Sequence, residues 1–142
     1  MNVHEIIVQT DKSKLWLSQN FPKISSRVIP NPVIYPLPIH NERSIKPDSL
    51  VSTSKKVILA SGRMHKYKQF DLLISAFSKM ANEYLDWDLV ILGEGEERIP
   101  LNRLIADLNL QTRVYLPGSV GNISEWYESC LLYTSDAADE HS

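Results

Sequence analysis

Two cations follow a glycine near the middle of the chain. Gly62 and Arg63 are adjacent, and Lys68 comes shortly after them. Arginine presents a planar fork of N–H donors that can bind a phosphate through two hydrogen bonds, whereas lysine supplies a mobile point charge. Glycine lets the backbone approach a ligand closely. These residues predict a site for a phosphate or a diphosphate, and the alternative is a surface loop with two solvated cations.

The residues on either side predict a strand that runs into a helix. Residues 57–60 form an apolar run typical of a strand buried on both faces, and Gly62 ends it. From Gln69 onward apolar side chains recur every three or four residues. The positions on this helix face are Phe70, Leu73, Ile74, Phe77, Met80 and Ala81. Because ligands gather where parallel strands end and helices begin, this junction favours the anion site over the solvated loop.

The alternation of predicted strands and helices continues along the chain. Residues 87–92 and 114–116 predict two further strands, and Pro100 suits the first turn of the helix between them. Asn122 with Glu125 resembles a capping box that opens a last helix. The expected inner positions of these two helices are Leu101, Leu104, Ile105, Leu108, Ile123 and Trp126. This order predicts an α/β fold with a parallel, right-handed, doubly wound sheet.

The first fifty residues have a different character. Residues 4–10 predict a strand, and residues 11–21 predict a helix that Thr10 caps. The side chains expected on the buried side of this helix are Leu15, Trp16 and Leu17. Residues 21–50 contain six of the 8 prolines and no glycine, which predicts a semi-rigid linker.

Several of these segments together resemble a known family. Ser61-Gly62-Arg63-Met64, followed by Lys68-Gln69-Phe70-Asp71, resembles the signature that opens the donor-binding domain of the group 1 glycosyltransferases. These enzymes, also called family 4, have the two-domain GT-B fold. The resemblance continues through residues 87–95 and 113–120, and upstream through residues 28–32. It implies a Rossmann-like sheet that forms an incomplete C-terminal half of a GT-B fold.

The resemblance also implies a division of the chain. Residues 1–27 are expected to be a remnant of the N-terminal Rossmann-like domain, residues 28–50 the interdomain linker, and residues 51–129 a truncated nucleotide-sugar-binding domain. The acceptor site and the catalytic residues would lie on missing parts, so no catalytic residue is assigned. Asn31-Pro32 stands where the family more often has Asn-Gly.

The last residues suggest a separate origin. Residues 130–142 resemble a translated transposase adapter from DNA sequencing libraries, and we expect them to be non-native. The alternative is that Leu131, Leu132 and Tyr133 form a genuine fourth strand, which the fold requires after the last helix.

Four residues are expected to bind the donor if the resemblance holds. Gly62, Arg63 and Lys68 would hold the diphosphate of a nucleotide sugar, taken to be a UDP-sugar, and Val120 would pack against its nucleobase. The donor is a substrate, and no cofactor or metal is expected. The two glycines at 93 and 95 are explained equally well by a tight turn and by donor contact.

The family's pair of glutamates separated by seven residues is not found. Glu125 and Glu128 precede the place of that motif and are assigned to a solvated helix face, and His65 to a surface loop. We therefore expect the fragment alone to be inactive.

The whole protein is expected to be a retaining glycosyltransferase. It would transfer a sugar from a nucleotide-diphosphate sugar to a saccharide or lipid-linked acceptor in surface polysaccharide or glycolipid synthesis. The alternatives are a non-catalytic nucleotide-binding or docking module, and a nucleotide-sugar epimerase of GT-B fold.

Length, charge and composition argue against several other classes of protein. The length of 142 residues allows about one domain, and a net charge of -2 argues against nucleic-acid binding. A single cysteine excludes an internal disulfide, and the four histidines lack metal-ligand spacing. No apolar run is long enough to cross a bilayer, and no signal peptide is visible. A cytoplasmic protein, peripheral to the inner membrane, is expected.

Overall fold

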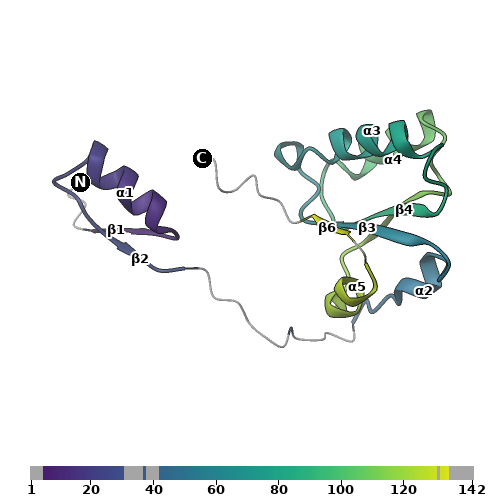
Figure 1. The fold of residues 1–142 in the computed structure, drawn as a ribbon, viewed down its shortest axis with the longest axis horizontal. Helices are drawn as coiled ribbons and strands as arrows, with labels where there is room; N and C mark the ends of the chain where they lie inside the picture. The colour runs from purple at the N-terminus through teal and green to yellow at the C-terminus, as the bar shows by residue number, and fades with distance from the viewer. Residues whose placement is uncertain (1–4, 31–36, 38–41, 131, 135–142) are drawn as a thin grey trace. The chain divides into compact units, whose positions relative to one another are not determined.

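The computed structural model describes residues 5–30, 37, 42–130 and 132–134. The chain divides into two compact units, Met1–Pro36 and Leu37–Ser142, and each has its own sheet (Figure 1).

The first unit is a small strand-helix-strand element. Its parts are β1 (Glu5–Val8), α1 (Asp11–Asn20) and β2 (Ser25–Val28). The strands β1 and β2 pair in parallel from Glu5 opposite Ser25 to Val8 opposite Val28. Thr10 caps α1, because its side-chain oxygen accepts a hydrogen bond of 3.1 Å from the Ser13 N–H. The predicted strand, helix and cap are confirmed.

The buried side of α1 was predicted wrongly. Leu17 is buried, but Leu15 and Trp16 are 60% and 55% exposed. Consecutive helical residues point about 100° apart, so three in a row cannot share one narrow buried side. Most of strand β2 lies within residues 1–27, the expected remnant of the N-terminal domain, where this second strand was not predicted; it forms through pairing with β1 rather than through an apolar run.

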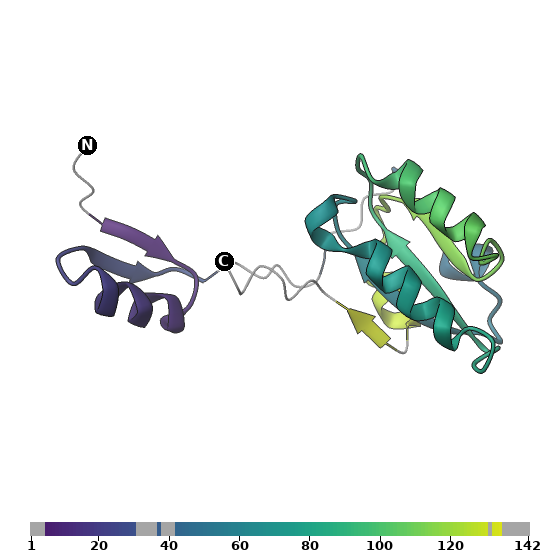
Figure 2. The same ribbon diagram turned by 90° about the horizontal axis from the view of Figure 1, so that it is seen from above.

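The second unit contains the parallel sheet predicted from the sequence. Its strands are β3 (Lys56–Ser61), β4 (Trp87–Leu92), β5 (Val114–Gly118) and β6 (Leu132–Thr134), in the order β5-β4-β3-β6. Its helices are α2 (Pro47–Leu50), α3 (Phe70–Met80), α4 (Arg98–Asp107) and α5 (Ile123–Ser129). Helices α3 and α4 cover one face of the sheet, and α2 and α5 lie on the other (Figures 1 and 2). The doubly wound, Rossmann-like arrangement is confirmed.

Alternate residues of β3 enter two different cores. Ile58 and Ala60 pack with the helices α3 and α4, whereas Val57 and Leu59 pack with Trp126 of α5. Side chains of a strand alternate between faces, so both faces of this central strand must be apolar. The predicted strand buried on both faces is confirmed.

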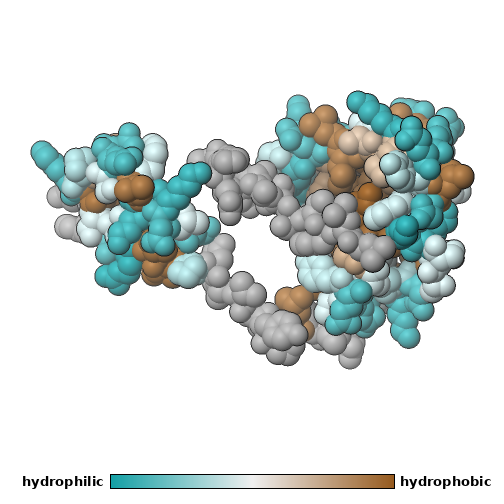
Figure 3. Space-filling view, in the orientation of Figure 1, coloured by the Kyte–Doolittle hydropathy of each residue, from teal (hydrophilic) through white to brown (hydrophobic). Residues whose placement is uncertain are grey.

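Some apolar side chains of the second unit remain on its surface. Figure 3 shows hydrophobic residues gathered in part over the side that carries α3 and α4. Leu72 of α3 and Ile99 of α4 are 58% and 64% exposed.

The order in which strands are added to the sheet reverses at β3. The strands β3, β4 and β5 follow one another outward, and β6 then pairs with the other side of β3. The fourth strand offered as an alternative is therefore present at Leu132–Thr134, whereas Leu131 lies outside the described residues. The origin of residues 130–142 stays a prediction. Ligands of such sheets bind beyond the carboxyl ends of the strands, near a reversal of this kind.

The end of the stretch predicted as a linker is helical. Helix α2 begins at Pro47, where proline fits because the first helical N–H groups need no intrahelical acceptor. The Asn31-Pro32 turn lies outside the described residues, and the predicted domain limits stay predictions.

Gln69, just before α3, has a left-handed backbone conformation with φ 53° and ψ 35°. A residue with a Cβ is strained there by about 1–2 kcal/mol, whereas glycine is not. Replacing Gln69 by glycine relieves this strain, but part of the gain in stability is offset because glycine is more flexible in the unfolded chain. We expect Gln69→Gly to raise the free energy of unfolding by about 0.5–1 kcal/mol in urea denaturation.

Asn109 provides the matched control, because its φ is 56° and asparagine tolerates this conformation better. Asn109→Gly should give a smaller gain, and an equal or larger gain would contradict the explanation.

Candidate functional site

A hollow of about 390 Å³ lies at the carboxyl edge of the second unit's sheet. Its walls come from the ends of β3, β4 and β5 and from the start of α5. The lining residues are Ser61, Gly62, Arg63, Leu92, Gly93, Glu94, Ser119, Val120 and Ile123. The fold thus brings together three of the four predicted site residues, Gly62, Arg63 and Val120.

Lys68 is not among the residues that line this hollow. It lies at the end of the short helix η1 (Lys66–Lys68), is half-buried, and has its Nζ 5.5 Å from the centre of the Tyr67 ring. Its contact with a diphosphate stays a prediction.

The loops after the strands are packed against one another through their backbones. The Gly62 N–H donates to the Leu92 carbonyl at 3.0 Å, and the Gly93 N–H donates to the Gly118 carbonyl at 2.9 Å. A Cβ on Gly93 would lie 1.9 Å from the Gly62 carbonyl oxygen. Gly93 therefore allows the loop after β4 to touch the loop after β3. The Gly62 N–H already donates to a carbonyl, so it is not available to a ligand. The contribution of Gly62 to the hollow is therefore the space left by its missing side chain.

We expect Gly93→Ala to lower the free energy of unfolding by about 2 kcal/mol or more, because a backbone shift must relieve the clash. Both positions have a positive φ, but Gly62→Ala should cost less, since its added Cβ would meet only the Phe70 Cζ, at an ordinary 3.5 Å. Urea denaturation of both variants tests the contrast, and equal losses would contradict it.

Two acidic side chains accompany Arg63 at the hollow. Arg63 is 70% exposed in its side chain, and its Nη2 lies 3.6 Å from Glu96 Oε2. Glu94 lines the hollow and accepts a 2.9 Å hydrogen bond from Arg98 Nη1. Arg98 Nη2 also donates to the Leu116 carbonyl at 2.7 Å, which anchors this pair to β5. Arg98 thus offsets the charge of Glu94.

His65 lies in the loop after β3 with a partly exposed side chain, as expected, and it has specific partners. Its Nε2 lies 3.0 Å from Glu96 Oε1, and its Nδ1 accepts a 3.4 Å hydrogen bond from the Tyr67 N–H. Its ring also lies 4.2 Å from the Tyr67 ring, measured between centroids. The loop after β3 is therefore tied to the loop after β4.

The predicted capping box at Asn122 is wrong. The Asn122 side chain is buried and does not cap α5. Its Oδ1 accepts from the Ile45 N–H at 3.1 Å, and its Nδ2 donates to the Ile45 carbonyl at 3.0 Å. A buried amide is better satisfied by these backbone groups than by the helix end. Asn122 thus ties the loop after β5 to the segment before α2.

The two glutamates of α5 differ from each other. Glu128 is exposed, as predicted, but Glu125 is half-buried and accepts a 2.9 Å hydrogen bond from Asn122 Nδ2.

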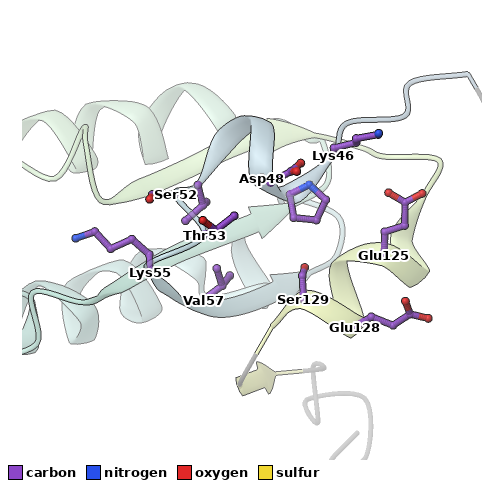
Figure 4. Close-up of a pocket in the computed structure, with 11 residues that line it drawn as sticks. Lys46, Asp48, Ser52, Thr53, Lys55, Val57, Glu125, Glu128 and Ser129 are labelled. Carbon is purple, nitrogen blue, oxygen red and sulfur yellow. The ribbon is translucent and has the colours of Figure 1, made fainter.

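A larger groove of about 540 Å³ lies elsewhere, between α2, α5 and the amino end of β3 (Figure 4). Two of its charged side chains, Lys55 and Glu128, point to opposite sides. Parallel sheets bind ligands at the carboxyl ends of their strands. The smaller hollow is therefore the candidate site.

The described ranges were also compared with the requirements of a metal site, a reactive thiol and a membrane span. They contain no group of three or more His, Cys, Asp or Glu side chains placed to hold a metal ion. Burial raises the pKa of the Cys130 thiol, which keeps it in the less reactive protonated form. No helix among these residues has the length and apolar character needed to cross a membrane.

Five lining residues were not predicted as site residues from the sequence: Ser61, Leu92, Glu94, Ser119 and Ile123. Glu94 had a usable signal, because it stands between two glycines directly after a strand. Ser119 and Ile123 are close to Val120 in the sequence. Their position in the hollow depends on the path of the loop between β5 and α5, which no local pattern indicates.

Comparison with known proteins shows similar glycosyltransferases. An uncharacterized glycosyltransferase of Haemophilus influenzae is 33% identical over 96 residues, which are 67% of this chain and 27% of that protein. The N-acetylgalactosamine-N,N'-diacetylbacillosaminyl-diphospho-undecaprenol 4-alpha-N-acetylgalactosaminyltransferase of Campylobacter jejuni is 38% identical over 83 residues, which are 58% of this chain and 22% of that protein. The chain thus spans about a quarter of the length of these relatives.

Solved structures show the same architecture. S. aureus TarM, as a mutant in complex with fondaparinux, alpha-GlcNAc-glycerol and UDP, matches with a TM-score of 0.72 at 26% identity. That match covers 91% of this chain and 24% of TarM. Such neighbours are GT-B glycosyltransferases, as the resemblance implied. The family described as glycosyl transferases group 1 matches residues 41–142. This chain therefore belongs to the group 1 glycosyltransferases.

Proposed function

We propose that the second unit is the donor-binding part of a retaining glycosyltransferase. The observation that carries this proposal is the hollow in which Gly62, Arg63 and Val120 meet at the ends of three parallel strands. Arg63 is the cation of this hollow and reaches solvent, so an incoming diphosphate has access to its guanidinium. The named relatives support transfer over the epimerase and docking-module alternatives.

The chemistry of this arrangement concerns the leaving group. When the bond between sugar and diphosphate breaks, negative charge grows on the departing nucleoside diphosphate. A guanidinium already in place stabilises this charge without reorganisation, and removing such a group typically lowers the rate about a hundredfold or more. Arg63 has this role in the proposal, and Lys68 adds a second positive charge. Val120 and Ile123 offer an apolar wall to the nucleobase.

The donor is proposed to be a UDP-sugar, since TarM was crystallised with UDP. The acceptor is proposed to be a saccharide or a lipid-linked saccharide, as the name of the Campylobacter relative indicates for that protein. A lipid-linked acceptor would place the reaction at a membrane surface, so peripheral contact with the inner membrane face belongs to the same proposal.

Calorimetric titration with UDP, GDP and ADP tests the donor proposal. One nucleoside diphosphate, expected to be UDP, should bind more tightly than the others. Absence of binding by all three would contradict a donor site in this chain.

A further inference from the structure

One carboxylate contacts two side chains at the rim of the hollow. Glu96, in the loop between β4 and α4, has its Oε2 3.6 Å from Arg63 Nη2 and its Oε1 3.0 Å from His65 Nε2. Each oxygen of this anion thus faces a different nitrogen. Both nitrogens belong to the loop after β3, next to the hollow.

The hydrogen-bond pattern assigns the proton of His65. Its Nδ1 accepts from the Tyr67 N–H, so this nitrogen carries no proton. In the neutral imidazole the proton is then on Nε2, which donates to Glu96 Oε1. Arg63 and His65 therefore both present N–H groups to one anion.

The pair between this anion and Arg63 is loose, although the 3.0 Å contact with His65 has the length of an ordinary hydrogen bond. The side chains of Arg63 and Glu96 are 70% and 54% exposed, and their separation of 3.6 Å exceeds that of an ordinary hydrogen bond. Water competes with such pairs, which therefore add little to stability. Arginine binds carboxylate and phosphate oxygens with the same planar fork. A phosphate can accordingly replace the Glu96 carboxylate at low cost.

We infer that Glu96 is an internal competitor of the donor's phosphate. In the donor-free molecule its carboxylate occupies the N–H groups of Arg63 and His65, and the donor's diphosphate displaces it. His65 then donates its Nε2 proton to a phosphate oxygen in a hydrogen bond, beside Arg63. This inference rests on the proposed function, because it assumes that Arg63 binds the donor diphosphate.

Glu96→Gln tests the competition, because it removes the charge and keeps the side-chain length. We expect UDP to bind the full 142-residue chain about two- to fivefold more tightly in this variant, as measured by NMR titration. Uridine has no phosphate, so its affinity should not change. A gain in affinity is informative because structural damage would cause a loss.

Glu97→Gln is the matched control. Glu97 is adjacent and carries the same charge, but in the described part of the chain it forms no ion pair with Arg63 or His65. It should change UDP affinity less than Glu96→Gln does. An equal gain from both variants would show a general charge effect and would overturn the inference.

The same titrations separate this inference from the proposed function. In a chain carrying Arg63→Ala and His65→Ala, Glu96→Gln should no longer improve UDP binding, and a persisting gain would overturn the competition. If Arg63→Ala weakens UDP binding while Glu96→Gln leaves it unchanged or weaker, the inference fails and the proposed function stands. If Arg63→Ala has no effect, or if the unaltered chain binds none of UDP, GDP and ADP, both fail.

Discussion

Arg63→Ala is expected to weaken UDP binding by about 10- to 100-fold, because it removes a charge-assisted hydrogen bond worth about 1.5–3 kcal/mol. Arg63 lines the hollow at the carboxyl ends of β3, β4 and β5. Its side chain is largely exposed and packs against no core, so its loss should not impair folding. Calorimetry with UDP measures the change.

Two variants make this expectation specific. Lys66→Ala removes an exposed cation from the same loop, and Lys66 does not line the hollow. It should leave UDP affinity nearly unchanged. Arg63→Lys keeps the charge but loses the planar fork, so it should bind UDP with intermediate affinity. Equal affinities of Arg63→Ala and the unaltered chain would remove Arg63 from the site.

Arg113→Met is expected to lower the free energy of unfolding by about 3–5 kcal/mol, because it leaves the Asp88 carboxylate buried without its partner. Asp88 is only 2% exposed, and Arg113 Nε donates to its Oδ1 at 2.8 Å. The Arg113 guanidinium also donates to the carbonyls of Ala81, Tyr84 and Trp87. This side chain therefore joins the start of β5 to the turn that leads into β4.

Urea denaturation measures this loss, and two further variants define its cause. Arg103→Met removes an exposed arginine of α4 that forms no ion pair among the described residues, and it should change stability little. Adding Asp88→Leu to Arg113→Met should recover part of the loss, because it removes the uncompensated charge. A loss below about 1 kcal/mol in Arg113→Met would contradict the role of this pair.

The central sheet was predictable because its signals are local. Apolar runs at 57–60 and 87–92 are long enough to identify buried strands, and a glycine follows each. The spacing from Phe70 to Ala81 identified α3 and its buried face in the same way. The junction with Arg63 was placed correctly at the carboxyl edge of the sheet because β3 and α3 were placed correctly.

The errors concern features that depend on distant partners. Strand β2 has the sequence Ser-Ser-Arg-Val, which shows no strand pattern and becomes a strand by pairing with β1. The Asn122 amide bonds to Ile45, which lies 77 positions earlier, so the local spacing to Glu125 suggested a cap that does not form. The link from Glu96 to Arg63 and His65 likewise needs two loops that only the sheet brings together.

The most direct test of the donor site is to determine whether UDP binds at the smaller hollow or at the larger groove. In an ¹⁵N-resolved NMR titration of the chain with UDP, we expect the largest shifts in the backbone amides around the smaller hollow, those of Gly62, Arg63, Gly93 and Val120. The amides of Ser52, Thr53 and Ser129, around the larger groove, should shift little. The largest shifts at the larger groove, or no shift at either place, would contradict a donor site at the smaller hollow.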